Sequence, residues 1–172
     1  ASMLQQLACL VIFGIANAAA VITGRTIGED DHEKAREQAT TFRLISYGIG
    51  AASFALIFFI RDLAVGFYNI DEATKALARQ MITVIAVITF FVSIIGICLV
   101  GVLRGGGDTR FCMFLEIGTL WFLGVPLGYL AASVLQLPVP FVLAAMKLDE
   151  PTKAVACVFR VRGGNWLRSV TR

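Results

Sequence analysis

The sequence predicts an all-α fold, a polytopic membrane helix bundle with five transmembrane helices. The chain is 58% hydrophobic with a mean hydropathy of +0.79, and 16% of its residues are charged, whereas soluble domains carry about 25% charged residues. Its charges lie between long uncharged runs, of which residues 80–103 form the clearest, 24 residues long. A spanning helix needs roughly 20 apolar residues. Backbone groups in lipid must be bonded internally, so such runs are helices.

The first two helices are expected at about 4–24 and 35–60. Each contains a charge-free run, 18 residues long at 7–24 and 17 residues long at 44–60. Asp30 and Glu33 stand three residues apart before the second run, which is the spacing of a capping box. The sequence therefore predicts a helical hairpin with a polar turn.

The third helix is expected at about 74–103. A large soluble core helix is the alternative, but such helices keep a polar stripe at helical spacing. This segment has only three scattered hydroxyls in its uncharged run, those of Thr83, Thr89 and Ser93. A membrane-spanning helix is therefore the better interpretation.

The stretch LRGGGDTR that follows predicts a tight turn. Gly105, Gly106 and Gly107 allow the chain to leave a helix with positive φ, and Asp108 can cap the next helix. A phosphate-binding loop is the alternative, but no strand precedes the glycines and no Gly-Lys-Ser/Thr follows. The turn interpretation is retained.

The fourth and fifth helices are expected at about 110–134 and 139–160, with a tail at 161–172. Thirty uncharged residues separate Glu116 from Lys147, and Pro138 and Pro140 interrupt them. Pro151 lies inside the fifth helix, where it removes one backbone hydrogen bond and can produce a kink.

Lysines and arginines predict the orientation. The connections after the first and third helices and the tail carry ten basic residues, and the opposite side carries three. The ten are Arg25, Lys34, Arg36, Arg43, Arg104, Arg110, Arg160, Arg162, Arg168 and Arg172, and the three are Arg61, Lys75 and Arg79. Basic residues collect in cytoplasmic loops, so we expect a multi-pass protein of the inner (plasma) membrane with a cytoplasmic C-terminus. The net charge of +3 reflects this asymmetry, and no nucleic-acid partner is expected.

Four polar residues inside the spans are candidates for binding a substrate or ion, because polar groups in a membrane are costly and often functional. Glu116 can bind a proton or cation, or pair with Arg110 or a neighbouring helix. Asp149 and Glu150 can do the same, or neutralise Lys153 and Lys147 four and three residues away. Asn17 can line a cavity or bond across closely packed helices.

The remaining reactive side chains predict no catalytic or metal site. His32 lies in an acidic turn with no second ligand cluster, so a solvated helix cap is the expected role. Cys9, Cys98, Cys112 and Cys157 have no paired spacing and behave as small hydrophobic residues. No Ser/His/Asp constellation is present, so we expect no enzyme and no cofactor.

Three segments resemble multidrug and toxic compound extrusion (MATE) transporters. GIANAAAVITGRTIGEDDHEKAREQA is similar to the helix and loop near the start of each half of these proteins. GVLRGGGDTRF resembles a turn of their C-terminal half, and KLDEPTKAVACVFRVRGGNWLRSVTR resembles their last helix and tail. The resemblance covers residues 1–172 and corresponds to helices two to six of the six-helix C-terminal lobe.

This resemblance implies a secondary active exporter that exchanges Na⁺ or H⁺ for organic cations by alternating access. The chain would be one part of it, with the N-terminal lobe as partner. Several members of the family carry ion-coupling carboxylates on the helix matching 74–103, but residues 80–103 hold none here. Two other functions stay open: a flippase for a lipid-linked precursor, which needs a cationic cavity, and a non-transporting membrane scaffold.

Overall fold

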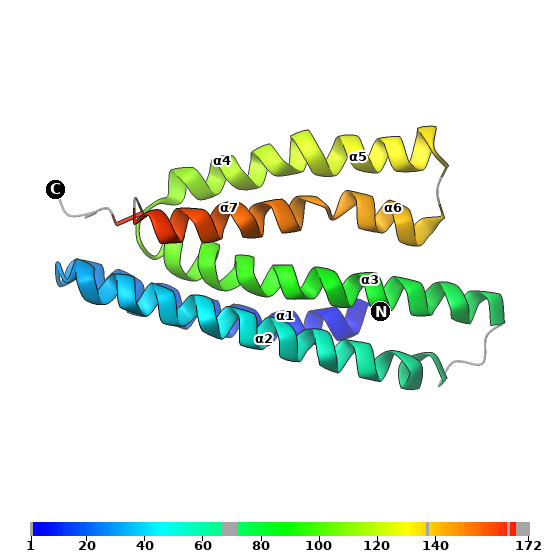
Figure 1. Ribbon diagram of the computed structural model, residues 1–172, viewed down its shortest axis with the longest axis horizontal. Coiled ribbons are helices and arrows are strands. Elements are labelled where there is room, and N and C mark those ends of the chain that lie inside the picture. Colours follow the sequence, from blue (N-terminus) through cyan, green and yellow to red (C-terminus); the bar gives the residue numbers. More distant parts are fainter. Residues whose placement is uncertain (1, 67–71, 137, 165, 168–172) are drawn as a thin grey trace.

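The structure is a bundle of helices that run side by side along one axis (Figure 1). It is a computed structural model, and it describes residues 2–66, 72–136, 138–164 and 166–167. Four helical segments of the described chain are long and apolar enough to cross a membrane: Cys9–Gly28, His32–Asp62, Thr74–Arg104 and Thr109–Val134. The all-α membrane bundle predicted from the sequence is confirmed.

Helices α1 (Ser2–Gly28) and α2 (His32–Gly66) form a hairpin. The cap of α2 differs from the predicted one by a residue. The backbone N–H of Lys34 donates to Oδ1 of Asp31 at 3.1 Å, while Asp30 adopts a left-handed conformation with φ of 60°. Asp30 forms the turn and Asp31 caps the helix, so the predicted capping box of Asp30 and Glu33 is wrong.

Helix α3 (Glu72–Ile95) continues into a π-helix, η1 (Gly96–Arg104), at the centre of the bundle. Helix α1 packs closely against η1 through small residues. A Cβ added to Gly101 would lie 2.9 Å from the Cβ of Ala19 and 3.1 Å from the carbonyl oxygen of Ala16. Such close approach of helix backbones is typical of membrane helix packing.

A tight turn joins η1 to the fourth span, and Gly107 adopts a φ of 86° within it. Asp108 stands at the helix N-cap, but its side chain makes no capping hydrogen bond. Its carboxylate accepts instead from Nε of Arg160, 2.8 Å away. The turn is confirmed, and the predicted capping role of the Asp108 side chain is wrong.

The fourth span is one continuous helical rod of alternating α and π geometry. It consists of α4 (Thr109–Thr119), η2 (Leu120–Gly124), α5 (Val125–Tyr129) and η3 (Leu130–Val134). Many large apolar side chains on it are exposed, Phe114 and Phe122 among them. This face fits contact with lipid or with another membrane domain.

The fifth predicted helix is broken in two. Helix α6 (Val139–Met146) ends at a turn, and α7 (Asp149–Gly163) begins after Leu148. Pro151 explains the break, because a proline ring clashes with the carbonyl four residues earlier, here that of Lys147, and donates no hydrogen bond. A single helix over 139–160 is therefore wrong, although the proline was correctly identified as its disruption.

The segment expected as a tail is partly built into the fold. Helix α7 extends to Gly163, and Trp166 is fully buried with its Nε1 donating to the carbonyl of Val161 at 3.0 Å. The Trp166 ring lies directly against Gly106, with no room for a Cβ at that position. The predicted start of the tail at residue 161 is therefore too early, and residues 165 and 168–172 lie outside the described part.

The connections gather at two ends of the bundle. The α1–α2 turn, the turn after η1 and the end of α7 share one end (Figure 1). At the other end, Arg79 on α3 reaches Asp62 on α2, with Nε and Oδ1 3.2 Å apart. Arg61 and Arg79 therefore lie at the end of the bundle opposite the α1–α2 turn.

Candidate functional site: a buried ion-pair cluster at a helix break

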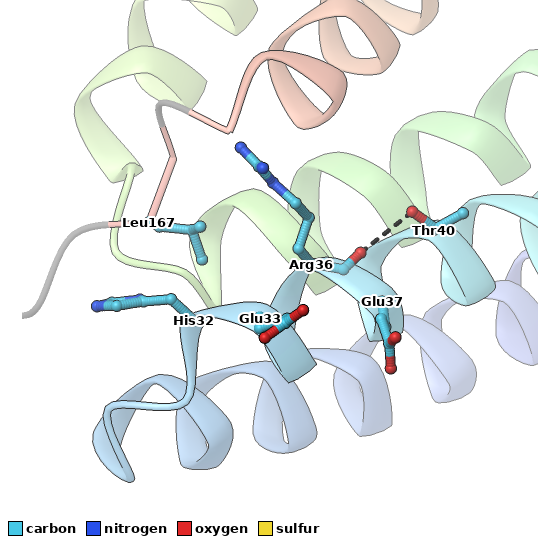
Figure 2. Close-up of a pocket in the computed structure, with 6 residues that line it drawn as sticks. All are labelled: His32, Glu33, Arg36, Glu37, Thr40 and Leu167. Atoms are coloured by element: carbon cyan, nitrogen blue, oxygen red, sulfur yellow. Dashed lines mark hydrogen bonds between the residues drawn. The ribbon is translucent and has the colours of Figure 1, made fainter.

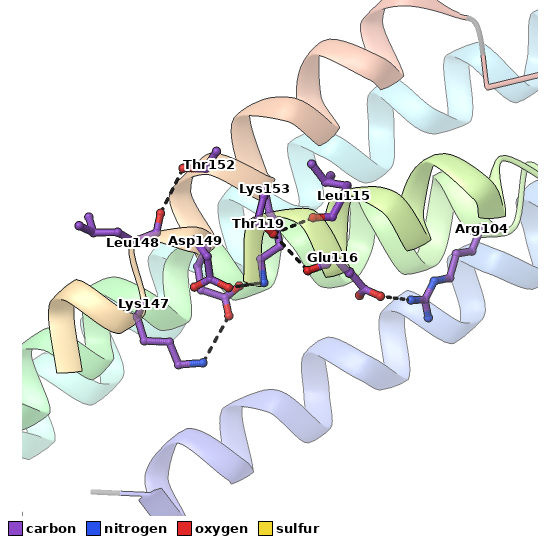
Figure 3. Close-up of polar contacts among 10 residues, drawn as sticks. Arg104, Leu115, Glu116, Thr119, Lys147, Leu148, Asp149, Thr152 and Lys153 are labelled. Carbon is purple, nitrogen blue, oxygen red and sulfur yellow. Dashed lines mark hydrogen bonds and ion pairs between the residues drawn. The ribbon is translucent and has the colours of Figure 1, made fainter. Parts of the chain in front are cut away.

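Four charged side chains lie at the break between α6 and α7, and Figure 3 labels Lys147, Asp149 and Lys153 among them. We call Lys147, Asp149, Glu150 and Lys153 the break cluster. Nζ of Lys153 lies 2.8 Å from Oδ2 of Asp149 and 3.6 Å from Oε2 of Glu150. Nζ of Lys147 lies 3.4 Å from Oε1 of Glu150. Both ion pairs expected from the sequence spacing are therefore present.

The break cluster is largely withdrawn from solvent. The side chain of Asp149 is 5% exposed and those of Glu150 and Lys153 are each 12% exposed, while Lys147 is more open. Buried charges are tolerated in proteins when they are paired. Two carboxylates and two ammonium groups give the cluster no net charge, which makes its burial possible.

One atom of the cluster is unsatisfied. Oδ1 of Asp149 is buried, and no described residue donates a hydrogen bond to it. A buried carboxylate oxygen retains the capacity to accept a proton or to contact a cation. The cluster can therefore neutralise its own charges, and Asp149 also offers one open acceptor.

Helix geometry explains why carboxylates are found here. Asp149 and Glu150 occupy the first turn of α7, where the helix dipole favours negative charge. Space for the break comes from glycines on the neighbouring rod. A Cβ on Gly124 would lie 3.3 Å from the carbonyl oxygen of Met146 and 3.8 Å from Cγ of Asp149. Small residues on the fourth span thus leave room for the chain between α6 and α7.

Glu116 on α4 lies near the break cluster but pairs elsewhere. Its Oε2 accepts from Nη2 of Arg104 at 2.6 Å, and Figure 3 shows its side chain turned toward Arg104, away from Lys153. Both partners are 42% exposed. Of the two pairings expected for Glu116, the one with a neighbouring helix is observed, and Arg110 is not its partner. A cavity of about 370 Å³ lies beside this pair.

Asn17 is separate from these groups. It is exposed on α1, whereas Ala16 and Ala19 are the residues that pack on η1. Its amide is thus not used in the α1–η1 contact. Cavity lining and bonding to another helix both stay as predictions for Asn17.

A larger cavity, about 620 Å³, lies at the end of the bundle that holds the α1–α2 turn (Figure 2). Figure 2 shows that Arg36 extends toward the end of α7, while His32 points outward from the turn. The Arg36 guanidinium lies against Gly164, the glycine with φ of 69° that ends α7. Since these side chains diverge, the cavity is a weaker candidate for a binding site than the break cluster.

The histidine and the buried cysteines considered in the sequence analysis lie in a turn and in the hydrophobic core. Nε2 of His32 lies 3.2 Å from Oδ1 of Asp30 in the exposed turn. Cys98, Cys112 and Cys157 are buried in the main core with Leu99 and Val102, consistent with their expected role as small hydrophobic residues. No group of three metal-ligating side chains occurs within the described residues.

The Asp108–Arg160 ion pair was missed by sequence reasoning. Its members are 52 residues apart, so no helical spacing connects them. The Arg160 guanidinium also stacks 4.8 Å from the ring centre of Phe111. The available signal was an acidic residue directly before an apolar segment.

Comparison with known proteins identifies the family. A model described as MatE matches residues 1–130. The chain belongs to the MatE family. This match covers the chain from α1 to the end of α5, which is most of the fourth span, and it agrees with the resemblance seen in the sequence.

Relatives of this MatE chain include bacterial and plant proteins. It is 36% identical over 125 residues to "Probable multidrug resistance protein NorM" of Xanthomonas campestris pv. campestris, covering 72% of the chain and 27% of that protein. It is 32% identical over 117 residues to "Multidrug resistance protein MdtK" of Pectobacterium atrosepticum, covering 67% and 25%. "Protein DETOXIFICATION 32" of Arabidopsis thaliana is 22% identical over 162 residues, covering 94% and 31%. No solved structure matches.

The MatE chain spans about a quarter to a third of the length of these relatives, since the matched parts are 25–31% of each. Its break cluster lies in α7 and the turn before it, beyond the residues matched by the family model. The family match therefore concerns the first four spans, and the break cluster is interpreted from its own geometry.

Proposed function

We propose that this chain is part of a secondary active efflux transporter that exchanges Na⁺ or H⁺ for organic cations. The observation that carries the proposal is the MatE match over residues 1–130, on a bundle with the expected helix order. Relatives named as multidrug resistance proteins support the substrate class. Alternating access is proposed from the general pattern of carriers, in which a site near the midplane faces each side in turn.

The chain would contribute one wall of a cavity between two lobes, and the N-terminal lobe would supply the other. Its exposed apolar side chains, such as Phe114 and Phe122, are consistent with packing against lipid or a second lobe. Coupling carboxylates would lie mainly outside this chain, since the uncharged run at 80–103 contains none. We place the C-terminus in the cytoplasm, on the basis of the uneven distribution of basic residues.

The pairing of Lys147 and Lys153 weakens the flippase alternative. A pyrophosphate group requires a cationic cavity, but both lysines lie within ion-pair distance of carboxylates. Two compensated lysines provide no excess positive charge for a lipid-linked pyrophosphate. Efflux of organic cations is the better-supported function.

Reconstitution tests the proposal. The complete protein that contains this chain is placed in liposomes, and efflux of a fluorescent organic cation is followed under an imposed Na⁺ or H⁺ gradient. We expect gradient-driven efflux from the complete protein and none from residues 1–172 alone, because a cavity between lobes needs both. A complete protein inactive under either gradient would overturn the proposal. Robust efflux from the 172-residue chain would instead indicate a carrier assembled from identical copies.

A further inference from the structure

A second site lies at the opposite end of the bundle from the cytoplasmic turns. A cavity of about 460 Å³ is formed between α2, α3 and α6. Its polar end has the side chains of Arg61, Arg79 and Thr83, and its apolar part has Val84, Phe141 and Ala144. This separation of charge from apolar surface matches an amphipathic ligand.

The Arg61 guanidinium is held in place from two sides. Its Nη1 donates to Oγ1 of Thr83 at 3.1 Å, and its Cζ lies 4.0 Å from the ring centre of Phe58. Thr83 is itself fixed, because its hydroxyl donates to the carbonyl of Arg79 at 2.8 Å. The Arg61 guanidinium is therefore held in position before any ligand binds, which reduces the entropic cost of binding.

The same guanidinium retains an unused donor. Nε of Arg61 is buried, and no described residue accepts a hydrogen bond from it. Asp62 lies 3.5 Å from this Nε and 3.2 Å from Nε of Arg79, so one exposed carboxylate is shared by two arginines. The cluster of Arg61, Asp62 and Arg79 carries a net charge of +1, and an anion would compensate it.

The depth of the site in the membrane indicates which kind of anion binds there. Arg61 directly follows the uncharged run at 44–60, and Arg79 directly precedes the run at 80–103. Both therefore lie at the edge of the hydrocarbon layer, where lipid phosphates are found. Val84 is five residues beyond Arg79, about 7.5 Å deeper along the helix. Arginine suits phosphate oxygens through its planar set of donors.

We propose that this cavity binds an anionic phospholipid, with its phosphate between Arg61 and Arg79 and an acyl chain along Val84, Phe141 and Ala144. The site joins α6 to the α2–α3 hairpin. A bound lipid would thus connect α6 to α2 and α3, at the end of the bundle away from the break. This binding is separate from transport and does not depend on the proposed efflux activity.

Native mass spectrometry of the detergent-purified chain tests the proposal, with phosphatidylglycerol and phosphatidylcholine of equal acyl length as probes. We expect preferential retention of phosphatidylglycerol. The double change Arg61→Gln with Arg79→Gln should reduce this retention by roughly tenfold or more, as expected for two basic residues near an anionic headgroup. The matched control, Arg25→Gln with Lys34→Gln, removes the same charge from the other end and should leave retention unchanged.

A second variant tests the apolar part without changing charge. Ala144→Phe fills the cavity and should also reduce retention of phosphatidylglycerol, with helicity and elution volume preserved. Inorganic phosphate should compete weakly, because it lacks an acyl chain. The proposal would be overturned by equal retention in the wild type and the double arginine variant, by an unaffected Ala144→Phe variant, or by inorganic phosphate that competes as well as the lipid.

Discussion

Arg160 and Asp108 join the last helix to the glycine turn after the third span, with Nε and Oδ2 2.8 Å apart. Asp108 is 2% exposed, whereas the Arg160 side chain is 25% exposed. The pair holds α7 against the start of α4, close to the site where Trp166 packs on Gly106. This ion pair and the Trp166 ring therefore both hold α7 at this end of the bundle.

The change Asp108→Asn should destabilise the fold, because it leaves the Arg160 guanidinium without its carboxylate. Removing one partner of a buried polar pair costs about 1–3 kcal/mol. The double change Asp108→Asn with Arg160→Gln should recover part of this loss, as expected for residues in contact. Thermal unfolding in detergent measures the cycle. Strict additivity of the two single changes would show that the pair contributes nothing to stability.

Gly106→Ala should lower the melting temperature, since the new methyl group would clash with the Trp166 ring. The ring is fully buried, so it has little room to move. Gly118→Ala on α4 is the matched control, because nothing lies within 4 Å of its added Cβ. We expect little change for Gly118→Ala. Equal melting temperatures for both variants would contradict the packing of Trp166 described above.

The break cluster should behave as a set of paired charges. Asp149→Asn alone leaves Lys153 with only the longer contact to Glu150, 3.6 Å away, and Lys153→Gln alone leaves Asp149 without its lysine, so each should reduce the amount of folded protein. The double change leaves neutral amides and should restore membrane abundance, with most transport retained. The assay scores efflux and abundance together in the complete protein, with Thr152→Ala on the exposed side of α7 as control. A stable double variant that does not transport would instead place Asp149 on the coupling pathway.

The orientation is tested with a reporter that is active only in the cytoplasm. Fused after Arg172 it should be active, and fused after Asn69 it should be silent, because ten basic residues lie on the first side and three on the second. A fusion after Gly107 should resemble the fusion after Arg172. The reverse pattern of activity would invert the topology.

Sequence reasoning located the spans because hydropathy depends on composition and length, and both are local. It also identified the Asp149–Lys153 and Lys147–Glu150 pairs, because a helical turn fixes which side chains meet. It failed at the start of α2, where a shift of one residue decides which aspartate caps the helix. Asp31 caps α2 in place of Asp30 because Asp30 takes the left-handed conformation of the turn.

Contacts between distant segments could not be derived in the same way. The partner of Glu116 is Arg104 on η1, and the partner of Asp108 is Arg160 on α7. These pairs depend on which helices are neighbours and how each is rotated. The full break at Lys147–Leu148 also depends on tertiary space, since Gly124 is what allows Met146 to approach.

The contact between α1 and η1 has a mechanical consequence. A Cβ on Gly105 would lie 2.8 Å from the carbonyl oxygen of Ala20, so the two backbones touch with no side chain between them. Neither helix can slide or roll against the other without collision, because only flexible side chains could absorb such a movement. We therefore expect α1 and η1 to move as a single rigid block. Any change of shape in this chain would then be accommodated between α6 and α7, where the helix is already interrupted.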